Sequence, residues 1–300
     1  MNSVDKNIPL ERSFSDIIAD YHELTKPGIT LAVLASMLVG YVLGSGASFS
    51  YLIMINVLIG TYLIASGTGA HNQFIERNLD SLMKRTRNRP LAAHRISPTN
   101  GKIFSLSLIF AGLIYLVVFV NPVAAAVSFA TTFIYLAIYT PMKRVSAFNI
   151  MIGAVPGALP PVGGWAATTG NISDPGMWIL FAILFLWQIT HVMAIAWFCK
   201  DDYAGAGYRM LPKNDISGKK TAFYAILCTV LLFPVSYALY YLKYSGMVYL
   251  VLAILLAAFY LYYTLVFAKE RTSQNARKLM FASIAYLPLI WAAVFIDRLF

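Results

Sequence analysis

Residues 247–267 read MVYLVLAILLAAFYLYYTLVF, and no charged side chain interrupts them. About 20 apolar residues is the length that an α-helix needs to cross the hydrocarbon core of a bilayer. Across all 300 residues, 59% are hydrophobic and 12% are charged, whereas about 25% of the residues of a soluble protein carry charge. The composition therefore predicts a polytopic membrane protein, and it excludes a disordered chain, a coiled coil and a disulfide scaffold.

Eight further apolar stretches have the same character, so we expect an all-α membrane protein with nine transmembrane helices in a bundle. The expected spans are 28–46, 51–71, 103–120, 122–140, 149–168, 176–198, 221–241, 247–267 and 279–297. Pro156, Pro160 and Pro161 predict a break in the fifth span, which a membrane helix tolerates where neighbouring groups satisfy the backbone.

The N-terminal residues 1–25 have no apolar core of the length found in secretory signals. We expect them to form a polar cytoplasmic tail with a short surface helix around Phe14–Tyr21. Residues 26–300 are then a single nine-helix membrane domain, whose first span acts as an uncleaved anchor.

The basic residues predict the orientation in the membrane, because Lys and Arg accumulate in cytoplasmic loops. On these span boundaries, 21 of the 23 Lys and Arg side chains lie on one side, and only Lys243 and Arg298 lie on the other. The pattern predicts an odd number of spans with the N-terminus inside and the C-terminus outside. Because the bases follow the positive-inside pattern, membrane orientation accounts for most of the net charge of +10. We therefore expect no nucleic-acid partner.

The first candidate site follows the second span, where Asn72, Glu76 and Asp80 are spaced four residues apart. In a helix this spacing places the three side chains on one face. Two carboxylates and an amide carbonyl suit Mg²⁺, a hard cation that binds a few protein oxygens together with substrate phosphates. The alternative is a polar helix end whose carboxylates pair with nearby bases.

Basic residues follow this acidic face directly. Arg85 and Arg89 are again four residues apart, and guanidinium groups bind phosphate oxygens in pairs. We expect both to contact a diphosphate, whereas positive-inside anchoring explains Lys84 and Arg87 well enough. Another pair of bases, Lys143 and Arg144, begins the third inside loop and fits the same small acidic ligand.

The second candidate site runs from His191 to the carboxylates Asp201 and Asp202. If one unbroken helix joins them, His191 and Asp202 share a face and lie about 16 Å apart along its axis. Asp202 then lies at the membrane surface, while His191 lies deep in the bilayer. Asp201 points elsewhere on the helix, but it can reach the metal where the helix ends. A histidine inside a span is a functional candidate, and the alternative is a histidine hydrogen-bonded to a neighbouring carbonyl.

Several long motifs in this order resemble the UbiA-type intramembrane prenyltransferases, and in detail the protoheme IX farnesyltransferase branch of that family. The matching stretches are Asn72-x₃-Glu76-x₃-Asp80-x₂-Met83-x-Arg85-Thr86-x₂-Arg89-Pro90-Leu91, Tyr139-Thr140-Pro-Met-Lys143-Arg144 with Asn149, Gly157-Ala-Leu-Pro160-Pro161-Val-Gly-Gly-Trp165, and Trp187-Gln188…His191…Asp202-Tyr203-Ala-Gly-Ala-Gly207…Met210-Leu-Pro212. They extend across roughly residues 72–212. The chain departs from the pattern at His94, where we expect glycine, and at Thr190, where we expect proline.

The resemblance implies a nine-helix bundle around a central cavity that opens to lipid. It also implies transfer of a farnesyl group from farnesyl diphosphate to a vinyl group of heme b, with Mg²⁺ as the metal. By position, Asn72, Glu76, Asp80 and Asp202 hold the metal and diphosphate. Arg85, Arg89, Lys143 and Lys200 contact the diphosphate oxygens, and Arg144 is a further substrate-binding candidate.

His191 is the candidate for contact with the acceptor, either as a ligand of the heme iron or as a proton acceptor. Two other functions stay open: a prenyltransferase of the same fold with an aromatic quinone-precursor acceptor, and a membrane transporter. The latter predicts charged residues in mid-span, and almost none are present apart from His191. The N-terminus lacks a transit-like segment, so we expect the bacterial inner membrane, with the active site near the cytoplasmic face.

Overall fold

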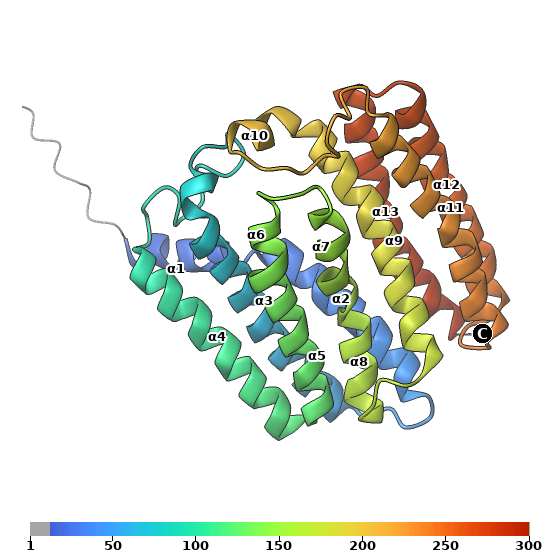
Figure 1. The fold of residues 1–300 in the computed structure, drawn as a ribbon. Helices are drawn as coiled ribbons and strands as arrows, with labels where there is room; N and C mark the ends of the chain where they lie inside the picture. Colours follow the sequence, from blue (N-terminus) through green and yellow to red (C-terminus); the bar gives the residue numbers. More distant parts are fainter. Residues whose placement is uncertain (1–12, 300) are drawn as a thin grey trace, which may run out of the picture.

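The computed structural model describes residues 13–299, and within them the only regular structure is helical (Figure 1). The elements, in chain order, are α1 (Phe14–Leu24), α2 (Pro27–Ser45), α3 (Tyr51–Asp80), α4 (Pro98–Phe119), α5 (Pro122–Phe133), the π-helix η1 (Ile134–Tyr139), α6 (Thr140–Met142), α7 (Asn149–Ala158), α8 (Pro160–Thr169), α9 (Pro175–Phe198), α10 (Lys200–Gly205), α11 (Lys219–Tyr241), α12 (Met247–Lys269) and α13 (Ser273–Asp297).

The prediction of nine membrane-spanning segments is confirmed for the described residues, because nine helical segments there are long and apolar enough to cross a bilayer. The fourth combines α5, η1 and α6, and the fifth combines α7 and α8. The expected break in the fifth span is present at Leu159, directly before Pro160. The short surface helix is also present as α1, which continues to Leu24, while residues 1–12 of the predicted tail lie outside the described residues.

The centre of the helix bundle is formed by α2, α7, α8 and α9 (Figure 1). The helices α11, α12 and α13 pack on one side of it, and α3, α4 and α5 pack on the other. The helices α2 and α8 approach each other closely, because a Cβ added to Gly164 would lie 1.9 Å from the Met37 carbonyl oxygen. Small residues let membrane helices approach this closely. In the α7–α8 segment, 72% of the most apolar stretch is buried inside the protein.

One helix is much longer than a bilayer requires. The helix α3 has 30 residues and continues nine residues past the predicted end of the second span. It therefore carries Asn72, Glu76 and Asp80 to the end of the bundle that also holds α10 and the loops rich in Lys and Arg (Figure 1).

Contacts between loops fix that end of the bundle. Arg95 forms ion pairs with Asp20 and Glu23, which ties α1 to the loop after α3. The Arg209 amide donates to the Lys143 carbonyl at 2.7 Å. Asn149 donates to the Arg209 carbonyl at 3.0 Å, so the loop after α10 is joined to the loop after α6.

The two departures from the family pattern have different structural outcomes. His94 adopts a left-handed backbone with φ of 56°, a conformation that glycine reaches without steric cost. The glycine expectation at this position thus has a conformational reason. Thr190 leaves α9 continuous from Pro175 to Phe198, and its hydroxyl donates to the Ala225 carbonyl of α11 at 3.2 Å.

Candidate functional site

The three predicted oxygen ligands on α3 are buried together. Asn72, Glu76 and Asp80 have exposed fractions of 1%, 5% and 1%. Their shared face follows from the four-residue spacing along a continuous helix. Because buried charges require partners, the face can exist only where bases from elsewhere in the chain reach it.

Each of these side chains has one basic partner. The Lys143 ammonium donates to Glu76 Oε1 at 2.8 Å, and the Arg89 guanidinium contacts both Asp80 oxygens at 2.8 and 2.9 Å. The Lys26 ammonium donates to Asn72 Oδ1 at 2.7 Å. The partners come from three separate segments of the chain, which therefore meet at this face.

Burial and neighbouring charges shift the pKa values of the lysines that contact the α3 face. Burial, reinforced by the nearby charges of Arg89 and Lys143, lowers the pKa of Lys26 to about 7. Burial also acts to lower the pKa of Lys143, but the Glu76 carboxylate outweighs it and the net pKa is raised. Lys143 lies 4.7 Å from the centroid of the Tyr139 ring, and this cation–π contact adds to its stabilisation. The group therefore holds positive charge in the protein interior.

The second predicted cluster differs from the expectation of one unbroken helix. The helix α9 ends at Phe198, Cys199 has φ of −101° and ψ of 20°, and α10 begins at Lys200. The assumption of a common helical face for His191 and Asp202 is therefore wrong. Asp201 is exposed and Asp202 is half-buried on the short α10.

Arg85 connects this cluster to the loop after α3. Its guanidinium donates to the Tyr203 hydroxyl at 3.3 Å and lies 5.8 Å from the centroid of that ring. The contact brings the segment of Asp201 and Asp202 toward the bases that follow α3. Arginine can stack on an aromatic face and also bind phosphate, so Arg85 can contact Tyr203 of α10 and a diphosphate near the loop after α3.

Some predicted residues are not brought to the α3 face. Arg144 and Lys200 are exposed, and the Lys200 ammonium lies 5.0 Å from the centroid of the Trp197 ring. Among residues 13–299, no three His, Cys, Asp or Glu side chains converge as a ready metal site. Within the same residues, the Asp201 and Asp202 side chains form no ion pair with a base of the α3 face.

His191 lies on α9, away from both clusters. Its Nδ1 atom is 2.6 Å from the Ser283 hydroxyl of α13, and its ring stacks on Trp187 with centroids 5.0 Å apart. The hydrogen-bonded histidine that the sequence left as an alternative is thus present, although its partner is a hydroxyl and not a carbonyl. The ring remains half-buried, so it is not sealed in the packed core.

Comparison with known proteins matches residues 33–285 to the UbiA prenyltransferase family. The chain belongs to the UbiA prenyltransferase family. It is 42% identical over 288 residues to a protoheme IX farnesyltransferase of Solibacter usitatus, with 93% of this chain and 98% of that one covered. It is 35% identical to a protoheme IX farnesyltransferase of Koribacter versatilis, with 99% of both chains covered.

Solved structures agree with the UbiA fold. A structure of digeranylgeranylglyceryl phosphate synthase superposes with a TM-score of 0.77 at 19% identity, over 93% of this chain and 98% of that one. A UbiA homologue from Archaeoglobus fulgidus, bound to DMAPP and Mg²⁺, superposes with a TM-score of 0.66 at 15% identity, over 92% and 99% of the chains. The family match, the farnesyltransferase relatives and the nine apolar helices of the described residues make this UbiA protein an integral membrane prenyltransferase.

Sequence reasoning missed two residues of this UbiA site. In the sequence, Lys26 contributed only to the count of bases that predicts the membrane orientation. Its position directly before Pro27, at the start of the first span, is the feature that could have indicated a role in the site. Its backbone has φ of 52°, a left-handed conformation that turns the chain toward α3. The other is Tyr208, which is buried beside Lys143, with the ammonium 6.0 Å from the ring centroid. Burial, and then the nearby Glu76 carboxylate, raise the pKa of Tyr208.

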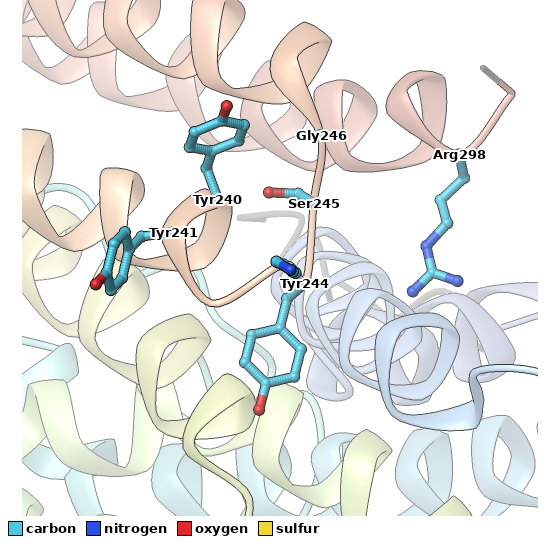
Figure 2. A pocket seen from close by; sticks show the side chains of 7 residues that line it. Tyr240, Tyr241, Tyr244, Ser245, Gly246 and Arg298 are labelled. Carbon is cyan, nitrogen blue, oxygen red and sulfur yellow. The ribbon is translucent and has the colours of Figure 1, made fainter.

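A cavity of about 610 Å³ lies far from this UbiA site, at the turn between α11 and α12 (Figure 2). Figure 2 shows tyrosines of that turn on one side and Arg298, at the end of α13, on the other. Lys243 also lines it, so the two bases predicted outside lie at one place. None of the predicted site residues lines this cavity.

Proposed function

We propose that this chain transfers the farnesyl group of farnesyl diphosphate to a vinyl group of heme b, giving heme O and diphosphate. The observation that carries the proposal is the α3 face, on which Glu76 and Asp80 are buried against Lys143 and Arg89. The relatives support the acceptor, because proteins named protoheme IX farnesyltransferase match nearly the whole chain.

The donor set of the site fits Mg²⁺. Asn72, Glu76 and Asp80 offer only oxygen atoms, the ligands that this hard cation prefers. We propose that these three residues, together with Asp201 and Asp202 of α10, hold the metal with the diphosphate. Bound Mg²⁺ supplies charge neutralisation on the phosphate oxygens.

The chain's own bases supply the rest of the electrostatics. Arg85, Arg89 and Lys143 bind the diphosphate and stabilise the negative charge that grows on it as the allylic C–O bond breaks. Lys143 is buried and the Arg89 side chain is 23% exposed, so their charges are screened less than in water. Arg85 is exposed. Arg144 and Lys200 stay substrate-binding predictions, and both are exposed in this structure.

The reaction balances with water as a further reactant. The C1–O bond of farnesyl diphosphate breaks, and the terminal vinyl carbon of heme forms a bond to farnesyl C1. Water adds to the inner vinyl carbon and loses a proton, which leaves a hydroxyethylfarnesyl group. The apolar helices exclude other water from the allylic cation until the vinyl group reacts. We propose that His191 contacts the heme, as an iron ligand or as a proton acceptor.

The test uses the purified full chain in detergent or liposomes with farnesyl diphosphate, heme b and Mg²⁺. We expect mass spectrometry of the extracted heme to show heme O, and a chelator to abolish it. A parallel reaction replaces heme with an aromatic quinone precursor. Prenylation of that acceptor, with no change in heme, contradicts the proposal and supports the other branch of the fold.

The location follows from the positions of the bases. We propose that the protein lies in a bacterial inner membrane, with the α3 face and α10 at the cytoplasmic end, where nearly all of its Lys and Arg residues are predicted to lie. Bacterial relatives support the type of membrane. Accessibility of a cysteine introduced at the exposed Lys84 to a membrane-impermeant reagent, in oriented vesicles, tests the orientation.

A further inference from the structure

Ser283 of α13 contacts two polar side chains of α9. The Trp187 indole donates to the Ser283 carbonyl at 2.8 Å, and His191 Nδ1 lies 2.6 Å from the Ser283 hydroxyl. Trp187 and His191 are four residues apart on α9, and their rings are nearly parallel, at 10°. The Tyr260 hydroxyl of α12 donates to the Trp187 carbonyl at 3.2 Å. Three helices therefore fix this pair of rings in one orientation.

The hydrogen bonds of Ser283 decide where the proton of His191 resides. A serine hydroxyl has one proton to donate, and Ser283 directs it to the Met280 carbonyl, 2.5 Å away on its own helix. The same oxygen can then only accept from His191 Nδ1, which must carry the N–H. A neutral imidazole has a single N–H, so Nε2 is left with its lone pair.

Nε2 has no hydrogen-bond partner within the described part of the chain, and it is not among the buried unpartnered atoms there. Because the His191 ring is only half-buried, this nitrogen reaches space that is not filled by protein. An unprotonated, accessible imidazole nitrogen whose opposite N–H is hydrogen-bonded is the usual arrangement of a metal-ligating histidine.

We propose that Ser283 is a positioning residue that holds His191 as the Nδ1-protonated tautomer, so that Nε2 ligates the iron of the heme acceptor. The proposal rests on the heme acceptor of the proposed function. It assigns the heme to the α9–α13 side of the bundle. Of the two roles that the sequence left open for His191, iron ligand and proton acceptor, it selects the iron ligand.

The surroundings of His191 favour iron ligation over proton transfer. A proton acceptor becomes an imidazolium, and a charge buried without a partner is costly. The side chains that hold the ring are Trp187 from α9, Ser283 from α13 and, behind Trp187, Tyr260 from α12. No carboxylate among residues 13–299 forms an ion pair with His191, whereas iron ligation leaves the ring neutral.

The test measures heme binding to the full chain without farnesyl diphosphate. Ferric heme b is titrated into wild type, His191→Ala, Ser283→Ala and Ser283→Thr, and the Soret band and electron paramagnetic resonance report the iron ligand. We expect His191→Ala to lose the histidine signature and Ser283→Ala to weaken heme affinity about 10- to 100-fold, the usual effect of removing the partner of a ligating histidine. Ser283→Thr keeps the hydroxyl and restores affinity.

Two controls separate ligation from folding. Metal-free protoporphyrin IX is bound equally by all variants, because it has no iron for Nε2. Ser66→Ala removes another buried serine, on α3, whose hydroxyl has no partner within the described residues, and it leaves heme affinity unchanged. If threonine does not fit at position 283, imidazole added to His191→Gly restores the ligand signature and supplies the rescue.

Two results overturn the inference. One is wild-type iron coordination and affinity in Ser283→Ala, which removes the positioning role. The other is a His191→Ala protein that keeps the wild-type iron spectrum but loses turnover, which makes His191 a proton acceptor. Failure of the proposed function is distinct, because it appears as wild-type protein that makes no heme O from farnesyl diphosphate and heme b.

Discussion

The buried pair of Glu76 and Lys143 allows a quantitative test of the site. The two charges lie 2.8 Å apart, and their side chains are 6% and 11% exposed. Lys143→Met removes one charge and leaves the Glu76 carboxylate buried without its ion-pair partner, which costs about 3–5 kcal/mol. Each 1.4 kcal/mol is a factor of ten, so we expect the ratio of folded to unfolded protein to fall by about 100- to 4,000-fold.

The double variant Glu76→Gln/Lys143→Met separates stability from chemistry. Two uncharged groups of similar volume leave no buried charge, so most of the lost stability returns. Activity does not return, because neither the carboxylate nor the base for the diphosphate is restored. Denaturant unfolding of wild type, Glu76→Gln, Lys143→Met and the double variant in detergent micelles gives the coupling energy. Heme O formation gives the activity of the same four proteins.

The control is Lys269→Met, which removes an exposed base at the end of α12 and changes neither stability nor turnover. The reasoning is refuted if Lys143→Met unfolds at the wild-type denaturant concentration. It is also refuted if the double variant is no more stable than Lys143→Met, because the carboxylate is then stabilised by something other than Lys143.

Three further predictions concern the metal ligands and the backbone. Asp80→Ala and Asp202→Ala raise the Mg²⁺ concentration for half-maximal heme O formation, and a normal Mg²⁺ titration removes either residue from the metal set. His94→Gly stabilises the protein by about 0.5–1 kcal/mol in denaturant unfolding, because it relieves a left-handed backbone at some cost in chain entropy. Gly164→Ala destabilises by about 1–3 kcal/mol or more through its clash with α2. Gly163→Ala is its near-neutral control, because its Cβ would meet only Val127, at 3.6 Å, and equal effects would contradict the packing argument.

The features predicted correctly from the sequence are those that depend on local rules. Span number follows from apolar length, and the structure has nine such segments in the described residues. The shared face of Asn72, Glu76 and Asp80 follows from helix geometry alone, because α3 runs unbroken through all three positions.

The features that were missed depend on contacts between distant segments. Lys26 reaches Asn72 across 46 positions, and Ser283 reaches His191 across 92. No local pattern contains either pair. The break at Cys199 is also invisible locally, because neither proline nor glycine marks it. Tyr203 behind the break is contacted by Arg85, 118 positions earlier in the chain.

The pairing of charges at the α3 face links metal binding to substrate binding. Arg89 contacts both oxygens of Asp80, and Lys143 contacts Glu76. A carboxylate that turns an oxygen to Mg²⁺ gives up part of its contact with its base, and that base then needs another anion. A diphosphate is such an anion, so metal and diphosphate each lower the cost of binding the other. Lys26 is a third base beside the two carboxylates, and burial with the charges of Arg89 and Lys143 lowers its pKa to about 7. A diphosphate anion bound there stabilises the charged form of Lys26, which a metal cation alone does not do.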